Sequence, residues 1–128
     1  LMRRRQSSRH GISAAASDVY TRRAGRVRRL GRFRLEGILY DLGPYPGLVP
    51  GKGVVHGELY ELMDAGALSA MDRFEEFDPA RPKLSPYLRE RWRLRDPDVE
   101  CWVYRYNKPV RGLPRVLGGD WLARRKRR

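Results

Sequence analysis

Few residues of this 128-residue chain have the types and spacing that catalysis or metal binding requires. The two histidines, His10 and His56, have no serine or cysteine at a spacing typical of a nucleophilic pair, so we expect neither to be catalytic. Cys101 is the single cysteine, and its place in an apolar strand pattern predicts a small, buried side chain. One cysteine excludes an intrachain disulfide, and with two histidines it leaves too few ligands for a structural zinc site.

Two acids, Glu75 and Glu76, stand side by side at the end of a predicted helix. A carboxylate in a partly apolar setting suits general acid and base catalysis, because desolvation raises its pKa towards neutral pH. The neighbouring Phe74 and Phe77 are candidates for such an apolar wall. Taken by themselves, however, adjacent acids are more often a solvated helix end than a catalytic site.

The formal net charge of +13 suggests a polyanionic partner, since Lys and Arg neutralise phosphates. The charge is concentrated at the ends: residues 1–34 carry +10, residues 121–128 carry +5, and residues 35–120 carry −2. Charge runs at chain ends are usually solvated, and these hold few aromatic residues on which bases could stack. No apolar run approaches the roughly 20 residues of a membrane span, so we expect no membrane partner and a cytoplasmic location.

A single α+β domain is expected to position these residues, because 128 residues allow one domain. Alternating and β-branched patterns predict strands over residues 33–41, 54–62, 87–95 and 99–107. Residues 42–53, with three Pro and four Gly, predict an ordered loop. Asp64 is predicted to cap a helix over about residues 65–74 with an apolar stripe of Leu68, Met71 and Phe74. A short Ala-rich helix is predicted over residues 12–20.

Six blocks of this sequence, in this order, resemble the γ-glutamylcyclotransferase-like family, and most closely its small bacterial AIG2-like members. They are GILYDLGPYPGLVPG (37–51), VVHGELYEL (54–62), ALSAMDRFEEFDP (67–79), SPYLRER (85–91), CWVYRYN (101–107) and GGDW (118–121). The resemblance covers residues 33–121 and leaves Arg-rich ends at 1–32 and 122–128. It implies that residues 1–128 form one domain, a small mixed β-barrel with flanking helices.

The resemblance also implies an enzyme of the acyltransferase or lyase type, with a small γ-glutamyl compound as its partner and no metal or cofactor. The α-amine of a γ-glutamyl amine or peptide would attack its own γ-carbonyl, giving 5-oxoproline and the free amine. Because this ring closure is intramolecular, the protein must hold one folded substrate and move protons. In the family a Glu in an Asp-x-x-Glu segment moves them. Asp72-Arg73-Phe74-Glu75 matches that segment, so Glu75 is the predicted catalytic residue.

Two departures from the family pattern bear on this prediction. Glu76 stands where the family often has Gly, which leaves open whether Glu75 or Glu76 faces the substrate. The family also has an N-terminal Tyr-Gly-Thr-Leu segment, ending its first strand, whose backbone amides bind the glutamyl group. Leu1 is expected to be the last residue of that segment in a shortened chain, with the first strand absent and the activity impaired.

Further substrate contacts are expected from Tyr45, Pro46 and Gly47 in the loop, and from Tyr87 at the start of a strand. Two alternatives to an enzyme stay open. One is a basic module that binds nucleic acid or another polyanion through the chain ends, and the other is a family member that keeps the fold without catalysis.

Overall fold

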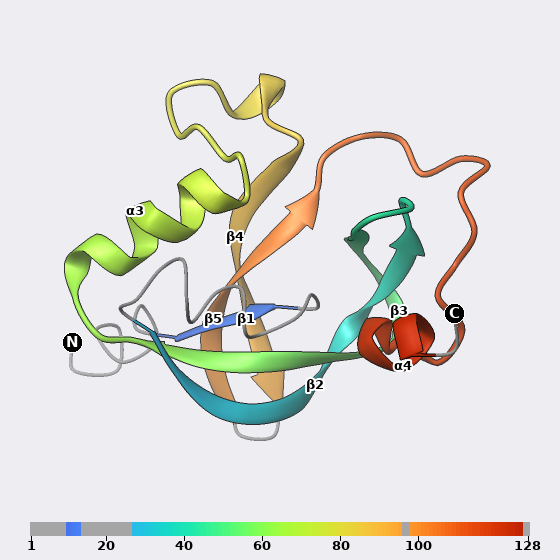
Figure 1. The fold of residues 1–128 in the computed structure, drawn as a ribbon, viewed down its shortest axis with the longest axis horizontal. Coiled ribbons are helices and arrows are strands. Elements are labelled where there is room, and N and C mark those ends of the chain that lie inside the picture. The colour runs from blue at the N-terminus through green and yellow to red at the C-terminus, as the bar shows by residue number, and fades with distance from the viewer. Residues whose placement is uncertain (1–9, 14–26, 96–97, 127–128) are drawn as a thin grey trace.

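Five strands form one sheet in the computed structural model, which describes residues 10–13, 27–95 and 98–126. The strands are β1 (His10–Ser13), β2 (Val27–Asp41), β3 (Pro46–Leu62), β4 (Tyr87–Arg95) and β5 (Asp98–Tyr106). Their order across the sheet is β2-β3-β1-β5-β4. Neighbouring strands run antiparallel except β1 and β5, which are parallel. The result is a mixed, strongly curved sheet (Figure 1).

The sheet is open, which corrects the expectation of a closed barrel but agrees with the α+β class. β2 and β4 are its two edges, and no ladder of hydrogen bonds joins them within the part of the chain that the structure describes. Irregular pairing between Arg29 and Gly31, and between Glu36 and Ile38, interrupts the ladder of β2 with β3. Such bulges bend and twist a strand, so the long β2–β3 pair curls around the core. Gly37 of β2 packs close to Trp92 of β4, but the two edge strands are not paired in the described residues.

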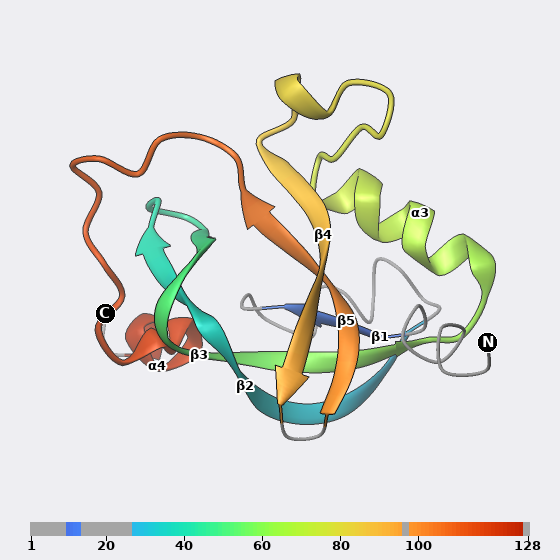
Figure 2. The same cartoon turned by 180° about the vertical axis from the view of Figure 1, so that it is seen from behind.

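Two α-helices lie towards opposite ends of the molecule (Figures 1 and 2). Helix α3 (Ala65–Phe74) follows β3 and lies on the side of β4 and β5, whereas α4 (Trp121–Lys126) lies beside the β2–β3 pair. Short 3-10 helices occupy Pro82–Leu84 (η1) and Leu117–Gly119 (η2). None of the helices in the described residues is long and apolar enough to cross a membrane.

The helix over residues 65–74 is confirmed, together with its predicted cap. The Asp64 carboxylate accepts hydrogen bonds from the backbone N–H groups of Gly66 (2.8 Å) and Ala67 (3.0 Å). The first N–H groups of a helix have no carbonyl of the preceding turn to donate to, so the Asp64 carboxylate stabilises the first turn by accepting from them. The predicted apolar stripe packs against the sheet, and its members are Leu68, Met71 and Phe74.

The strand predictions hold best for β4 and β5, whereas β2 and β3 both start earlier than expected. β4 has the predicted bounds, and β5 starts and ends one residue earlier than expected. The predicted loop over residues 42–53 is wrong from Pro46 onwards, because residues 46–49 pair with residues 38–41 of β2. Of the Ala-rich helix predicted over residues 12–20, Ile12 and Ser13 instead lie in β1, and the rest falls outside the described residues.

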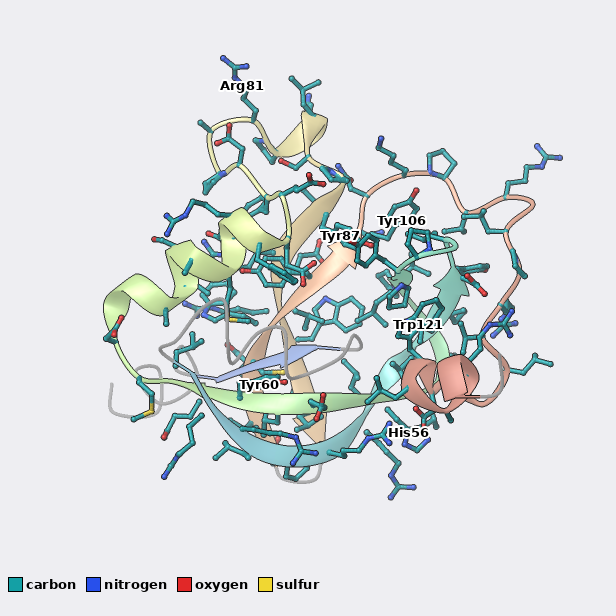
Figure 3. The ribbon with its side chains drawn as sticks, viewed as in Figure 1. His56, Tyr60, Arg81, Tyr87, Tyr106 and Trp121 are labelled. Carbon is teal, nitrogen blue, oxygen red and sulfur yellow. The ribbon has the colours of Figure 1, made fainter. Side chains whose placement is uncertain are left out.

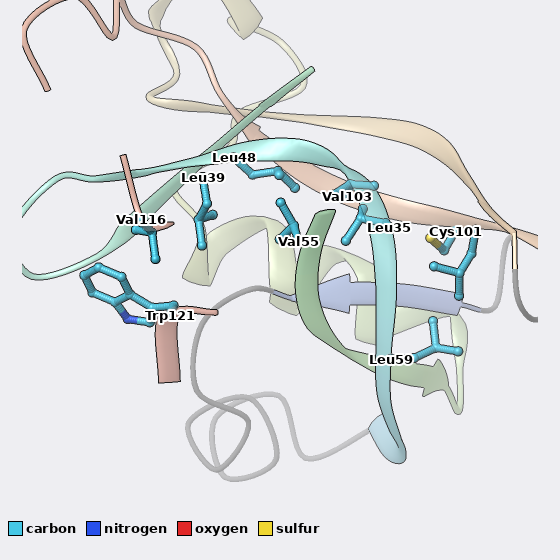
Figure 4. Close-up of a cluster of buried hydrophobic side chains, with 10 residues drawn as sticks. Leu35, Leu39, Leu48, Val55, Leu59, Cys101, Val103, Val116 and Trp121 are labelled. Atoms are coloured by element: carbon cyan, nitrogen blue, oxygen red, sulfur yellow. The ribbon is translucent and has the colours of Figure 1, made fainter. Parts of the chain in front are cut away.

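Two hydrophobic clusters use alternate residues of the same strands, so they lie on opposite faces of the sheet. The cluster shown in Figure 4 holds Leu35, Leu39, Leu48, Val55, Leu59, Leu94, Cys101, Val103, Val116 and Trp121. The second lies under α3 and holds Tyr60, Leu62, Ala67, Met71 and Tyr104. Cys101 is buried as predicted, and burial raises the pKa of its thiol to about 12. Such a thiol stays protonated and serves packing.

Candidate active site

Four side chains form one surface of the β4–β5 ladder, which we call the ladder face: Tyr87, Arg89, Tyr104 and Tyr106. Tyr87 pairs with Tyr106 and Arg89 pairs with Tyr104. Because alternate residues of a strand point the same way, all four project to the side that carries α3. The rings of Tyr87 and Tyr106 meet edge to face, 5.6 Å apart. They lie where β4 starts and β5 ends (Figure 3).

Asp72 fastens the last turn of α3 to the ladder face. Its Oδ1 atom accepts hydrogen bonds from the hydroxyl of Tyr104 at 2.6 Å and from Nε of Arg89 at 2.8 Å. The carboxylate is buried, so both bonds form in a medium of low dielectric. Burial, and then the bond to Asp72, raises the pKa of the Tyr104 phenol far above its usual value. Tyr104 is therefore a neutral donor that holds the helix in place.

Glu75 lies three residues after Asp72, at the C-terminal cap of α3. Residues three apart on a helix share a face, so Glu75 is directed towards the same ladder face as Asp72. It is half-buried, and its charge contributes to raising the pKa of Tyr87 and of Tyr104. Burial is the larger cause for both tyrosines. The carboxylate predicted to be catalytic thus stands beside two neutral phenols.

Glu76 is exposed, and its backbone explains why glycine suits this position. Among the described residues it is the one non-glycine residue with a positive φ, 56°. The N–H of Glu76 donates to the carbonyl of Arg73 (3.2 Å), and the N–H of Phe77 donates to that of Asp72 (2.8 Å). These two bonds close the helix in a motif that requires a left-handed residue at position 76, most often glycine. The two acids differ in burial, and the half-buried Glu75 raises the pKa of Tyr87 more than the exposed Glu76 does.

Glu76→Gly is expected to raise the free energy of unfolding by about 0.5–1 kcal/mol, because glycine adopts positive φ without the steric penalty. Chemical denaturation of the two proteins measures this gain. Glu76→Ala is the matched control, since it removes the same carboxylate but keeps a Cβ in the left-handed conformation. An equal gain in both variants would show that charge, and not backbone strain, is relieved.

The start of β3 approaches the ladder face from the other side. The hydroxyl of Tyr87 donates a hydrogen bond to the carbonyl of Pro46 at 2.9 Å. A Cβ on Gly47 would lie 3.1 Å from Cγ of Tyr106, so a side chain there would push the ring away by a few tenths of an ångström. Of the predicted substrate-binding residues, Pro46, Gly47 and Tyr87 are therefore brought together near Glu75. The donor capacity of the Tyr87 hydroxyl is used by the protein itself.

Tyr45, another predicted substrate contact, is 61% exposed but lies close enough to Tyr87 to contribute to raising the pKa of that phenol. It ends a turn in which the N–H of Leu42 donates to the Tyr45 carbonyl at 3.0 Å. Leu1 lies outside the described residues. His56 lies beside α4, well away from Tyr87 in Figure 3. No group of His, Cys, Asp and Glu suited to hold a metal ion occurs in the described parts of the chain.

Sequence reasoning missed the partners that hold Glu75 in place, namely Asp72 with Arg89 and Tyr104. The sequence did predict the two strands, over residues 87–95 and 99–107, that carry Arg89 and Tyr104. The register of the two strands and the placing of α3 were needed to bring them to Asp72. These contacts show that Asp72, near the end of α3, belongs to a polar cluster with Arg89 and Tyr104.

The basic residues of β2 are largely paired with acids. Arg28 forms an ion pair with Glu61 at 2.7 Å, and Arg32 forms one with Asp120 at 2.8 Å. Arg29 is bonded to the buried Glu58. Cations engaged in this way are less available to phosphates, which weakens the alternative of a polyanion-binding module on this part of the chain. The rest of the basic N-terminal region lies outside the described residues.

Comparison with known proteins gives matches over nearly the whole chain. A sequence model of the family described as gamma-glutamyl cyclotransferase, AIG2-like, matches residues 10–123. The gamma-glutamylcyclotransferase family protein YtfP of Escherichia coli K12 is 40% identical over 98 residues, which are 76% of this chain and 79% of that relative. The ytfP protein of Citrobacter rodentium is 38% identical over 96 residues, which are 74% of this chain and 76% of that relative.

Solved structures share the fold. The solution NMR structure of ytfP from Escherichia coli matches with a TM-score of 0.68 and 31% identity, covering 91% of this chain and 98% of that one. A crystal structure of an uncharacterized protein from Pyrococcus horikoshii matches with a TM-score of 0.68 over 94% of this chain and 95% of that one. Its identity of 19% supports the fold alone. The extent of the family match and of the identity to YtfP shows that this chain belongs to the gamma-glutamyl cyclotransferase, AIG2-like family.

Proposed function

We propose that the protein cyclises a γ-glutamyl amine or peptide to 5-oxoproline and releases the amine, with Glu75 transferring the protons. The observation that carries the proposal is the position of Glu75, half-buried beside Tyr87 and Tyr104 at the end of a helix fixed to the sheet. A general base must be held near its substrate in a setting that excludes part of the water. Membership of the family supports the same reaction.

The proposed reaction requires little from the protein beyond holding the substrate and moving protons. The α-nitrogen of the substrate forms a bond to its own γ-carbon, and the bond from that carbon to the leaving nitrogen breaks. Glu75 takes the proton that the α-nitrogen loses and delivers one proton to the leaving amine, so the carboxylate is restored. Pre-folding the substrate into the near-attack shape accounts for much of the rate gain in intramolecular reactions of this kind.

The neutral phenols around Glu75 fit this role. Burial and neighbouring negative charge raise the pKa of Tyr87 and Tyr104 well above the usual tyrosine value, so neither competes with Glu75 as a base. Each phenol already donates its proton to a fixed protein acceptor, Tyr87 to Pro46 and Tyr104 to Asp72. Asp72 at the same face is engaged by Arg89 and Tyr104, so we assign the proton transfer to Glu75.

Release of 5-oxoproline from a panel of γ-glutamyl amines and γ-glutamyl peptides tests the proposal. We expect 5-oxoproline and free amine in equal amounts from at least one member, measured by mass spectrometry. The matched α-glutamyl isomers are the control, because their amide lies at the α-carbonyl, where attack by the α-amine would close a three-membered ring. If no member of the panel is cyclised, the protein is a family member without this activity and the proposal is overturned.

A further inference from the structure

We propose that Arg89 is an anchor for a carboxylate on the ligand, and that the protein therefore selects γ-glutamyl compounds whose α-carboxylate is free. This inference rests on the proposed function for the identity of the ligand. The carboxylate site itself is argued from the geometry of Arg89 alone. Three features carry it: the fixed orientation of the guanidinium group, its unused nitrogens and its position on the ladder face with Tyr87 and Tyr104.

The orientation of Arg89 is fixed on two sides. Its Nε atom donates to Oδ1 of Asp72 at 2.8 Å. Its guanidinium carbon lies 4.5 Å from the centre of the Trp102 ring and 5.6 Å from that of Phe77. A guanidinium held by a carboxylate and stacked on aromatic rings loses little further freedom when it binds a ligand.

The two terminal nitrogens of Arg89 are left for a ligand. Within the described residues, the hydrogen bonds of this side chain run through Nε alone. The side chain is 17% exposed, so the group is mostly desolvated but open to solvent on one side. Terminal nitrogens in this arrangement match the two oxygens of a carboxylate, which they bind in parallel.

Arg89 also stands at a suitable place for the proposed substrate. It neighbours Tyr87 on the ladder face and pairs with Tyr104, and both tyrosines are influenced by the charge of Glu75. Phe77, which contacts the guanidinium, lies two residues after Glu75. In a γ-glutamyl compound the α-carboxylate and the α-amine sit on the same carbon. A substrate anchored at Arg89 would thus bring its α-amine towards Glu75.

Arg91 offers an internal comparison on the same strand. Its guanidinium carbon also lies over Trp102, at 4.6 Å, but on a side chain that is 47% exposed. Its terminal nitrogen Nη1 is 3.7 Å from Glu100, whereas the acid beside Arg89, Asp72, is bonded to Nε and leaves the terminal nitrogens to a ligand. Screening by water and by this acid makes Arg91 a weak carboxylate site, although its charge and its aromatic contact resemble those of Arg89.

Binding of the product distinguishes the two arginines without requiring turnover. We expect NMR titration of the full chain to show 5-oxoproline bound at least about 10-fold more tightly than its neutral primary amide, as befits a charge-assisted hydrogen bond. In Arg89→Lys the preference falls several-fold, because the cation remains but the paired donors are lost. In Arg89→Met it disappears. Arg91→Met retains the wild-type preference.

Each outcome bears on the proposal. Arg89→Met could lose its ligand preference simply because it fails to fold. Arg89→Lys keeps a cation beside Asp72 and therefore tests ligand binding in a folded protein. The amide NMR spectrum of each variant reports whether it is folded. Equal binding of acid and amide by the wild-type protein, no binding of either, or a preference that survives in Arg89→Lys and Arg89→Met, would overturn the inference. An Arg89-dependent preference in a protein that cyclises nothing would instead overturn only the proposed reaction.

Discussion

Glu75→Gln is expected to lower kcat/KM for 5-oxoproline release by about 10²- to 10⁴-fold, the usual contribution of a positioned general acid or base. The amide has the shape of the carboxylate but cannot accept the proton of the α-amine. Folding should be preserved, because the backbone N–H of Glu75 still donates to the carbonyl of Met71 (2.9 Å) at the helix end. Initial rates with the best substrate of the γ-glutamyl panel, together with a thermal melt, measure both effects.

Glu76→Gln is the matched control for this prediction. It removes the same charge one residue later, from an exposed side chain that acts on Tyr87 less strongly than Glu75 does. We expect its kcat/KM to stay within about threefold of the wild-type value, since water screens an exposed charge. Full activity in Glu75→Gln, or an equal loss in Glu76→Gln, would remove Glu75 from the role of proton carrier.

Local signals in the sequence predicted the elements that depend on near neighbours. The bounds of α3 follow from Asp64 at its start and from the apolar spacing of Leu68, Met71 and Phe74, and the structure confirms them. The alternation of residues 87–95 likewise predicted β4, whose partner β5 follows after a short connection. In both cases the information lies within a few residues of the element, where side-chain periodicity reports directly on burial.

The sequence was a poorer guide where Pro and Gly residues lie inside a paired strand. Three Pro and four Gly between residues 42 and 53 predicted a loop, yet β3 starts at Pro46 because β2 offers its backbone groups to residues 46–49. Pro46 itself is the first residue of its strand, a position at which a missing N–H costs little. Whether the curved sheet closes into a barrel depends on the reach of β2 towards β4, which no local pattern encodes.

At the candidate site, one residue was predicted by resemblance to the family, but contacts between distant parts of the chain were not. Resemblance to the family predicted Glu75, and the glycine preference at position 76 is explained by a positive φ that spacing alone cannot reveal. The hydrogen bonds of Asp72 that fix the helix end carrying Glu75 were not predicted. They join α3 to Arg89 of β4 and to Tyr104 of β5, which are 17 and 32 residues away in the sequence. A polar residue in a helix and an arginine in a strand look like surface residues until their distance is known.

Asp72→Ala is expected to lower the free energy of unfolding by about 3–5 kcal/mol, because it leaves the largely buried Arg89 cation without its partner. It also leaves the hydroxyl of Tyr104 without its acceptor. For a domain of this size the loss corresponds to a fall in melting temperature of about 10–20 °C. Denaturation followed by circular dichroism measures it. We also expect lower activity in the folded variant, because Asp72 fixes the helix end that carries Glu75.

Asp98→Ala is the matched control, since Asp98 pairs with Arg93 on the same ladder at 3.3 Å, but with side chains 73% and 60% exposed. A surface pair of this kind contributes about 0–1 kcal/mol, so the control should unfold almost as the wild-type protein does. In Asp72→Ala/Arg89→Met the unpaired charge is gone, and we expect the double variant to lose less stability than the two single losses together. Additive losses, or a loss in Asp72→Ala no larger than in Asp98→Ala, would mean that the buried pair does not hold α3 on the sheet.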